Sequence, residues 1–229
     1  MSCTSWPSIP EIKDLFTEGI AAAGGTVSDV FEDTARLFAR SILPDIREVQ
    51  PGDRVQGGVA LRATDRDICV HPYVFRQVCT NGAIIAQALQ TKRIRCHDFK
   101  EAPESTAEVL EGVRESVRAC CSDEAFSTTV LEMRSALETE ADVVLQLMPM
   151  VARLPQHLAT QIMADVFERF EAAKDRSRFG LVNAVTSLAR DTREPEMRWR
   201  LEKIGGGMLA KLKPAPAPKK AGTEAVMVA

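Results

Sequence analysis

The chain has 229 residues, 45% of them apolar and 27% charged, so its length and composition suit one soluble globular domain with appendages. Only 5% of the residues are aromatic, which argues against a stacking platform for single-stranded nucleic acid. The net charge of −3 gives no overall attraction to a polyanion, and no apolar run approaches the roughly 20 residues that cross a bilayer.

The first residues, MSCTSWPSIPEIKD, contain neither the basic segment nor the apolar segment of a signal peptide. We therefore expect a cytoplasmic protein that does not act at a membrane. The six cysteines are then expected to stay reduced rather than to form disulfides.

Two helices are predicted near the N-terminus. Apolar residues recur at helical spacing in Glu11–Ala23, and Gly24-Gly25 ends the run. Ser28 is a candidate N-cap for a second helix, whose apolar side would hold Val30, Phe31, Ala35 and Phe38. The run Leu37–Leu43 fits either the end of that helix or a strand.

An antiparallel hairpin is predicted after the turn Pro51-Gly52-Asp53. Apolar residues alternate with others from Arg54 to Arg62 and again from Ile68 to Val78, and the loop Thr64–Asp67 joins the two runs. Pro72 cannot donate a backbone hydrogen bond, so its part of the second strand is expected at an edge or a bulge.

Two short elements are predicted to follow the hairpin. Ala83–Leu89 is apolar enough for a short buried helix, with Thr80 or Asn81 as its cap. Lys92–His97 suits a third strand, in which Ile94 and Cys96 would face inward.

The pattern becomes helical from Ser105 and remains so to the end of the last apolar stripe. Pro149 and Pro155 are expected to bracket a break, Pro195 fits the first turn of the last helix, and Gly205–Gly207 is typical of a helix terminator or hinge.

The sequence therefore predicts an α+β fold, a small antiparallel sheet followed by a multi-helix layer. We expect an N-terminal helix and lead-in over 1–27 and one domain over 28–210, with a sheet over 37–98 and helices over 104–210. The Pro/Ala/Lys-rich tail 211–229 cannot bury a core and is expected to be disordered.

Positive charge is concentrated between Arg36 and Arg95, whereas Asp and Glu dominate from Asp98 to Asp142. A basic half of this kind can form a binding face, and a sheet backed by helices would allow several arginines to neutralise phosphates. The candidates for contact with single-stranded DNA or another nucleic acid are Arg62, Arg76, Arg93 and Arg95. The alternative is that the two halves are solvated faces that attract each other.

Cysteine and histidine residues gather in and beside the predicted sheet, at Cys69, His71, Cys79, Cys96 and His97. Their spacing matches no usual zinc pattern, so we expect no metal and no cofactor. A nucleophile pair of Cys79 with His71 or His97 is chemically conceivable, but buried cysteines on strands are usually small core residues.

A second group of polar candidates consists of Cys79, Thr80, Asn81 and Asn183. Asn81-Gly82 is typical of a tight turn, although Asn81 beside Arg76 and Thr80 could also grip a phosphate or a base edge. Asn183 and Thr186 lie on an otherwise apolar helix, where they either satisfy buried backbone groups or reach toward Cys79–Gly82.

The order of these motifs resembles the phage- and plasmid-associated family called domain of unknown function 932. The resemblance spans roughly Leu37 to Met208 and rests on Gly52-Asp53, on Arg76–Gly82 (RQVCTNG) and on Asn183–Thr186 (NAVT). The loop Thr64–Asp67 is shorter than is usual in that family. The resemblance implies a mobile-element protein without an established activity, in a setting such as replication or recombination.

Three functions remain open from the sequence. The first is association with nucleic acid through the basic segment. The second is a protein-interaction or oligomerising module, in which the acidic helices bind a partner or the chain forms a homo-oligomer. The third is an enzyme of unrecognised class, which would require at least three of the polar candidates to converge in one pocket.

Overall fold

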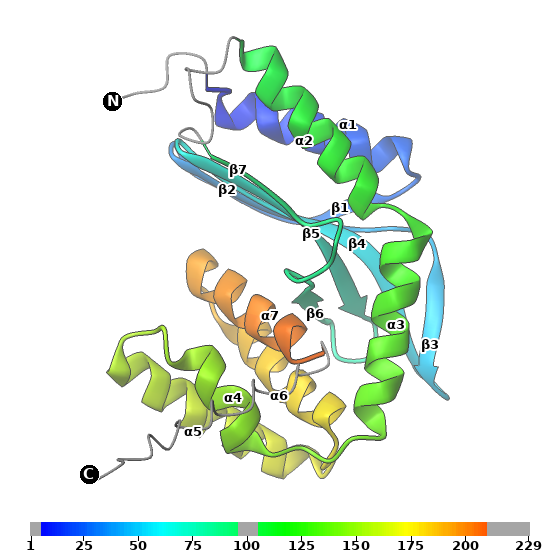
Figure 1. Cartoon of the computed structure of the whole chain (residues 1–229), viewed down its shortest axis with the longest axis vertical. Helices are drawn as coiled ribbons and strands as arrows, with labels where there is room; N and C mark the ends of the chain where they lie inside the picture. Colours follow the sequence, from blue (N-terminus) through cyan, green and yellow to red (C-terminus); the bar gives the residue numbers. More distant parts are fainter. Residues whose placement is uncertain (1–5, 96–104, 210–229) are drawn as a thin grey trace, which may run out of the picture.

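The computed structural model describes residues 6–95 and 105–209 and confirms the α+β fold class (Figure 1). The strands are β1 (Thr26–Glu32), β2 (Arg36–Ile42), β3 (Ile46–Gln50), β4 (Asp53–Thr64), β5 (Asp67–Arg76), β6 (Asn81–Ile84) and β7 (Lys92–Arg95). The helices are α1 (Ile9–Ala22), α2 (Thr106–Cys120), α3 (Asp123–Leu137), α4 (Val143–Val151), α5 (Gln156–Ala173), α6 (Arg178–Asp191) and α7 (Pro195–Leu209).

One antiparallel sheet contains all seven strands. Its order is β1-β2-β4-β5-β6, while β3 pairs with the start of β4 and β7 with the start of β5. The predicted hairpin is confirmed as β4 and β5, which pair from Val55 opposite Arg76 to Ala63 opposite Ile68. These two long strands form the centre of the sheet.

Helices cover both sides of this sheet (Figure 1). On one side, α1 and α2 pack on apolar residues such as Leu61 and Ile68. On the other side, Trp199 of α7 packs on Cys69 and Tyr73. The two side-chain sets alternate along the same strands, because successive residues of a strand point to opposite faces.

The predicted N-terminal helix is confirmed as α1. Ser8 caps it through a capping box with Glu11, and its buried stripe is Ile12, Leu15, Phe16 and Ile20. Gly24 has a φ of +73°, a left-handed conformation that favours glycine, so the helix ends where the glycine pair begins.

The predicted second helix at Ser28 is wrong, because β1 and β2 occupy this segment and the sheet begins at Thr26. Asp33 accepts hydrogen bonds from the backbone N–H groups of Ala35 and Arg36 and so turns the chain between the strands. Phe31 lies directly opposite Phe38 across the pair. The apolar residues thus come together by cross-strand pairing, although their spacing also fits a helix.

The predicted short helix over Ala83–Leu89 is also wrong. Asn81–Ile84 forms strand β6, which pairs with β5, and a loop leads from it to β7. A Cβ atom at Gly82 would lie 2.0 Å from the Tyr73 hydroxyl, so this strand fits only because position 82 has no side chain. The third strand is confirmed over Lys92–Arg95 with Ile94 buried, whereas Cys96 and His97 lie outside the described residues.

Pro72 lies inside strand β5, which β4 flanks on one side, and on the other side β5 is locally unpaired at Pro72, as the predicted edge position requires. Pro72 is tolerated because its missing N–H would point away from β4, into the gap between β6 and β7. The carbonyl of Pro72 accepts from Ile85, beyond the end of β6, and β7 pairs only up to Val70 on that side. No ladder hydrogen bond is lost where the two short strands leave a gap.

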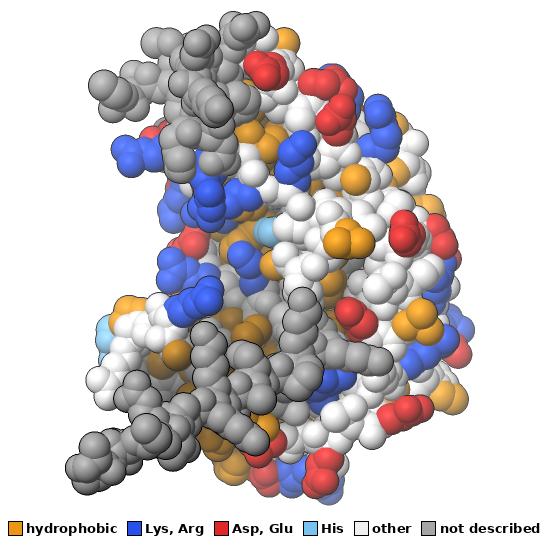
Figure 2. All heavy atoms as spheres, in the orientation of Figure 1, with side chains coloured by type: hydrophobic (Ala, Val, Ile, Leu, Met, Phe, Trp, Pro, Cys, Tyr) orange, Lys and Arg blue, Asp and Glu red, His pale blue; other side chains and the backbone are white. Residues whose placement is uncertain are grey.

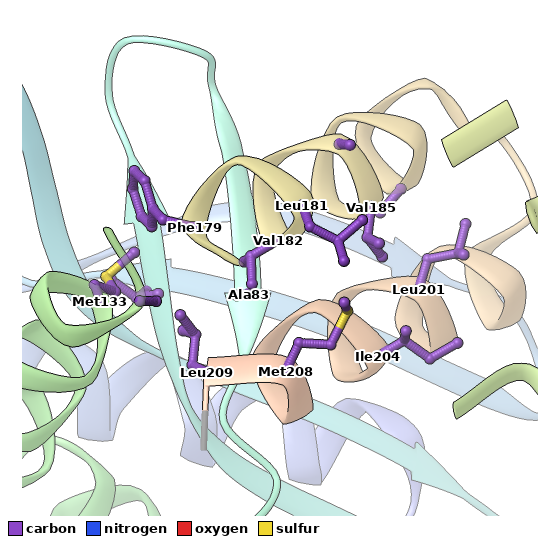
Figure 3. Packing of buried hydrophobic residues seen from close by; sticks show 14 of the residues in the cluster. Ala83, Met133, Phe179, Leu181, Val182, Val185, Leu201, Ile204, Met208 and Leu209 are labelled. Atoms are coloured by element: carbon purple, nitrogen blue, oxygen red, sulfur yellow. The ribbon is translucent and has the colours of Figure 1, made fainter. Parts of the chain in front are cut away.

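The described residues from Ser105 to Leu209 are helical as predicted, but they do not form one layer, because α2 packs beside α1 on one side of the sheet and α7 packs on the other. Pro149 lies within α4 rather than outside a helix, and Pro155 immediately precedes α5. Figure 3 shows how α6 and α7 face each other through residues such as Val185 and Leu201, with Met133 of α3 beside them. The largest apolar cluster of the described chain lies between these helices and the far end of the sheet.

Helix α7 runs through Gly205–Gly207, so the prediction of a terminator or hinge there is wrong. A Cβ atom at Gly206 would lie 2.0 Å from the carbonyl oxygen of Ile84. The glycine instead allows the backbone of α7 to approach the backbone of β6. The predicted tail 211–229 lies outside the described residues, and none of the described helices combines the length and apolarity needed to span a bilayer.

Candidate functional site

The arginines predicted to contact nucleic acid do not all share one face of the sheet. Arg62 lies opposite Cys69, which lies opposite Arg93, so Arg62 and Arg93 point to the α7 side. Arg95 follows Arg93 by two residues and points the same way. Arg76 lies opposite Val55 and points to the other face.

Carboxylates from the sheet and from α7 neutralise part of this charge. Arg62 donates to Asp67 at 2.8 Å and to Glu196 of α7 at 2.9 Å, and Arg93 also donates to Asp67. Burial raises the pKa of Asp67, but the hydrogen bond from Arg93 and the charge of Arg62 outweigh burial and lower it. Arg62 therefore ties α7 to the sheet, while Arg93 keeps a half-exposed side chain.

Cations from β4, β7 and α7 nevertheless gather along one side of the molecule, which we call the basic flank. It consists of the exposed Lys92, Arg93 and Arg200 and the half-buried Arg62, Arg95 and Lys203. Within the described residues, Lys92 and Lys203 form no ion pair. In Figure 2 the outline is indented between the sheet and the lower helices, and Lys and Arg side chains gather along this indentation.

His71 is buried beneath the basic flank, with 4% of its surface exposed. Its Nδ1 lies 3.1 Å from the Thr91 hydroxyl, which itself donates to the Ile85 carbonyl. Since that hydroxyl has one proton, Nδ1 donates and Nε2 carries the lone pair. Nε2 is buried and has no hydrogen-bond partner in the described structure.

The imidazole of His71 packs on Trp199, with ring centroids 5.6 Å apart. Burial, reinforced by the charges of Lys203 and Arg93, lowers the pKa of His71 to about 3. The ring is therefore neutral at physiological pH and cannot act there as a general acid.

Cys69 and Cys79, the other described candidates of this group, do not form a reactive pair with His71. Burial raises the pKa of the Cys69 thiol, which keeps it protonated. Cys79 contacts Arg76 and Arg190, whereas His71 contacts Thr91 and Trp199, so the structure does not join them as a nucleophile pair. No group of three metal-ligating side chains occurs in the part of the chain that the structure describes.

Three of the second set of polar candidates, Cys79, Thr80 and Asn81, lie at the β5–β6 turn, beside Arg76, which points to the opposite face. Arg76 donates to both oxygens of Asp53, at 2.6 and 2.7 Å, and to the Cys79 sulfur at 3.1 Å. Its guanidinium lies 5.2 Å from the centre of the Phe179 ring. A paired, stacked arginine of this kind is a structural tie rather than a free phosphate ligand.

Asn81 connects the same turn to helix α6. Its Nδ2 donates to the Thr186 hydroxyl at 2.7 Å, and that hydroxyl donates to the Val182 carbonyl at 2.9 Å. Asn183 contributes no side-chain hydrogen bond within the described structure, and the exposed Thr80 bonds only the carbonyl of Cys79. Of the two residues that the sequence singled out on this helix, Thr186 both bonds a buried backbone carbonyl and reaches Asn81, whereas the Asn183 side chain does neither.

Sequence reasoning missed the buried ion pair that fixes α7. Arg40 of β2 donates to both oxygens of Glu202, at 3.0 and 2.8 Å, and Arg198 adds a bond of 3.2 Å. Burial raises the pKa of Glu202, and the two guanidinium groups oppose that rise. The available signal was the i,i+4 pair Arg198–Glu202, which resembles an ordinary solvated helix pair.

Comparison with known proteins adds no further assignment. No protein-family model, no curated protein and no solved structure matches the chain. The family resemblance stays a prediction, and the candidate site has to be judged on its own geometry.

Proposed function

We propose that the chain binds nucleic acid through the basic flank, by contacts with the phosphate backbone. The observation that carries the proposal is the convergence of cations from two elements, the exposed Lys92 and Arg93 of β7 with the exposed Arg200 and the half-buried Lys203 of α7. Lys203 and Arg93 are close enough together to act on the same imidazole. Several phosphates can be neutralised by such a strip without base-specific contacts.

The binding residues in this proposal differ from the four arginines predicted from the sequence. Arg62 and Arg76 are engaged with carboxylates at 2.6–2.9 Å and are less exposed than Arg93, so they hold the fold. The direct phosphate contacts fall to Lys92, Arg93, Arg200 and Lys203. A role for a phage or plasmid protein beside replication or recombination, as the family resemblance implies, is compatible with backbone binding of this kind.

The test is a fluorescence-anisotropy titration with labelled single-stranded DNA, duplex DNA and RNA. With four phosphates neutralised, affinity should fall about 50- to 150-fold between 50 and 200 mM salt. The double variant Lys92→Glu/Lys203→Glu should lose most of the binding, because it reverses two charges that form no ion pair in the described structure.

The matched control is Arg114→Glu/Arg118→Glu on α2, which covers the other side of the sheet (Figure 1). It changes the net charge by the same amount but leaves the basic flank intact. Equal losses in the two double variants, or no binding of the unmodified chain at 50 mM salt, would overturn the proposal.

A further inference from the structure

Helix α4 presents an apolar face to solvent. Val144, Leu145 and Met148 are 58%, 64% and 55% exposed, and they are neighbours on the helix because they lie at positions i, i+1 and i+4. The opposite face, with Leu147 and Val151, is buried against the other helices. No charged residue occurs between Val143 and Ala152.

An uncharged surface helix with such a face is uncommon in a monomer, because surface helices normally turn a polar face to water. The helix lies on the side of α7 away from the sheet (Figure 1), and none of its residues belongs to the basic flank. The charges at the two ends of α4 indicate what kind of partner covers this face.

These charges are opposite in sign. Glu138, Glu140 and Asp142 precede the helix, and Arg153 follows it. Asp142 caps the helix by accepting from the backbone N–H of Leu145 at 2.8 Å, and Arg153 is exposed and forms no ion pair with a described residue. An antiparallel copy of the same helix would match apolar face to apolar face and acidic end to basic end.

We infer that α4 pairs with α4 of a second copy of this chain across a two-fold axis, which makes the protein a homodimer. In this arrangement Asp142 of each protomer lies near Arg153 of its partner, and the interface is self-complementary, as a two-fold interface requires. Met148 lies closest to the axis, because 142 and 153 are placed symmetrically about that part of the helix.

The first measurement is sedimentation velocity of the full chain over a range of concentrations. The unmodified chain should be dimeric and dissociate on dilution. Leu145→Asp should be monomeric, whereas Leu131→Asp on α3 should remain dimeric. Leu131 and Leu145 are both 64% exposed, so the control matches the variant in residue type and exposure.

A second measurement locates the axis. Met148→Cys should form a disulfide between two protomers under mild oxidation, and Leu131→Cys should not exceed the background from the native cysteines. Arg153→Glu should raise the dissociation constant about tenfold, because two symmetric ion pairs become repulsive.

A monomeric chain at every concentration would overturn the inference and would mean that another segment or partner covers α4. A dimer that Leu145→Asp leaves intact, or that Met148→Cys does not cross-link, would overturn it as well. None of these outcomes depends on nucleic-acid binding, because the two faces are mutated separately.

Discussion

The two faces of the central hairpin are built from neighbouring residues yet differ in chemistry. Toward α1 and α2, strands β4 and β5 place Val59, Leu61, Ala63, Ile68 and Val70 in an entirely apolar cluster. The residues that alternate with these point toward α7. The buried side chains on that face include Arg40 of β2, Asp67 and His71 of β5, and Glu202 of α7. The first face gains stability from removing apolar area from water, whereas the second fixes orientation through charges and hydrogen bonds.

The two faces should therefore respond differently to mutation and to pH. An apolar face loses stability in proportion to the volume removed, at any pH. A buried polar face loses stability when one partner of a hydrogen bond or ion pair is removed, because the other partner stays buried without it. Its contribution to the free energy of unfolding also depends on pH.

The largest expected effect is at the buried ion pair. Arg40→Ala should lower the free energy of unfolding by about 3–5 kcal/mol, because Glu202 stays buried after losing its main partner. Chemical denaturation at pH 7 measures it. The double variant Arg40→Met/Glu202→Leu should recover most of the loss, since Asp29 and Arg198 can still pair with each other at 2.9 Å. A loss below about 1 kcal/mol in Arg40→Ala would show that the pair does not hold α7.

A smaller effect is expected from the protonation of His71. Its pKa is about 3 when folded, against roughly 6.5 in an unfolded chain. Between these values the unfolded state binds the extra proton, so stability is complete above pH 6.5 and falls as the pH falls. The chain should therefore lose about 2–3 kcal/mol between pH 7 and pH 4.5, measured by urea denaturation.

Two control variants, one on each face of the hairpin, test the role of His71. His71→Gln should remove that part of the pH dependence. Leu61→Ala, on the apolar face, should cost about 2–5 kcal/mol at both pH values and leave the slope unchanged. The same slope in His71→Gln as in the unmodified chain would contradict the assignment.

The smallest effect is expected at the tie between β6 and α6. Thr186→Val should cost about 1–2 kcal/mol, because it leaves the buried amide of Asn81 without its acceptor. Asn183→Leu should stay within about 0.5 kcal/mol, since the Asn183 side chain is half-buried and makes no hydrogen bond to another described residue. Thermal denaturation of both variants distinguishes them, and a larger loss in Asn183→Leu would reverse the assignment.

The elements that bury apolar residues could be predicted from the sequence, and those that depend on a distant partner could not. The hairpin and the helices that follow it were predictable, because alternation along β4 and β5 and stripes in α2 to α7 reflect burial against apolar neighbours. The segment at Ser28 was not, because Phe31 and Phe38 satisfy both a helical spacing and a cross-strand pair. Local patterns cannot distinguish those cases without the partner strand.

The candidate site was predictable only in part. The basic segment pointed to Arg93, but Lys203 and Arg200 lie more than a hundred residues away in sequence, and only the docking of α7 brings them beside it. Likewise Arg62 and Arg76 resembled free cations because their partners Glu196 and Asp53 are distant in sequence or separated by a turn. Charge composition indicates which residues are available, and tertiary pairing decides which of them remain free.

The contact between Gly206 and the Ile84 carbonyl bears on how mutational scans of this chain should be read. Any side chain at position 206 would have to displace the last helix from the sheet, and the lysine and arginine three and six positions earlier would move with it. Position 206 would then score as intolerant in a screen for binding although it contacts no ligand. A parallel screen for cellular abundance would separate such a scaffold glycine from residues that touch the bound molecule.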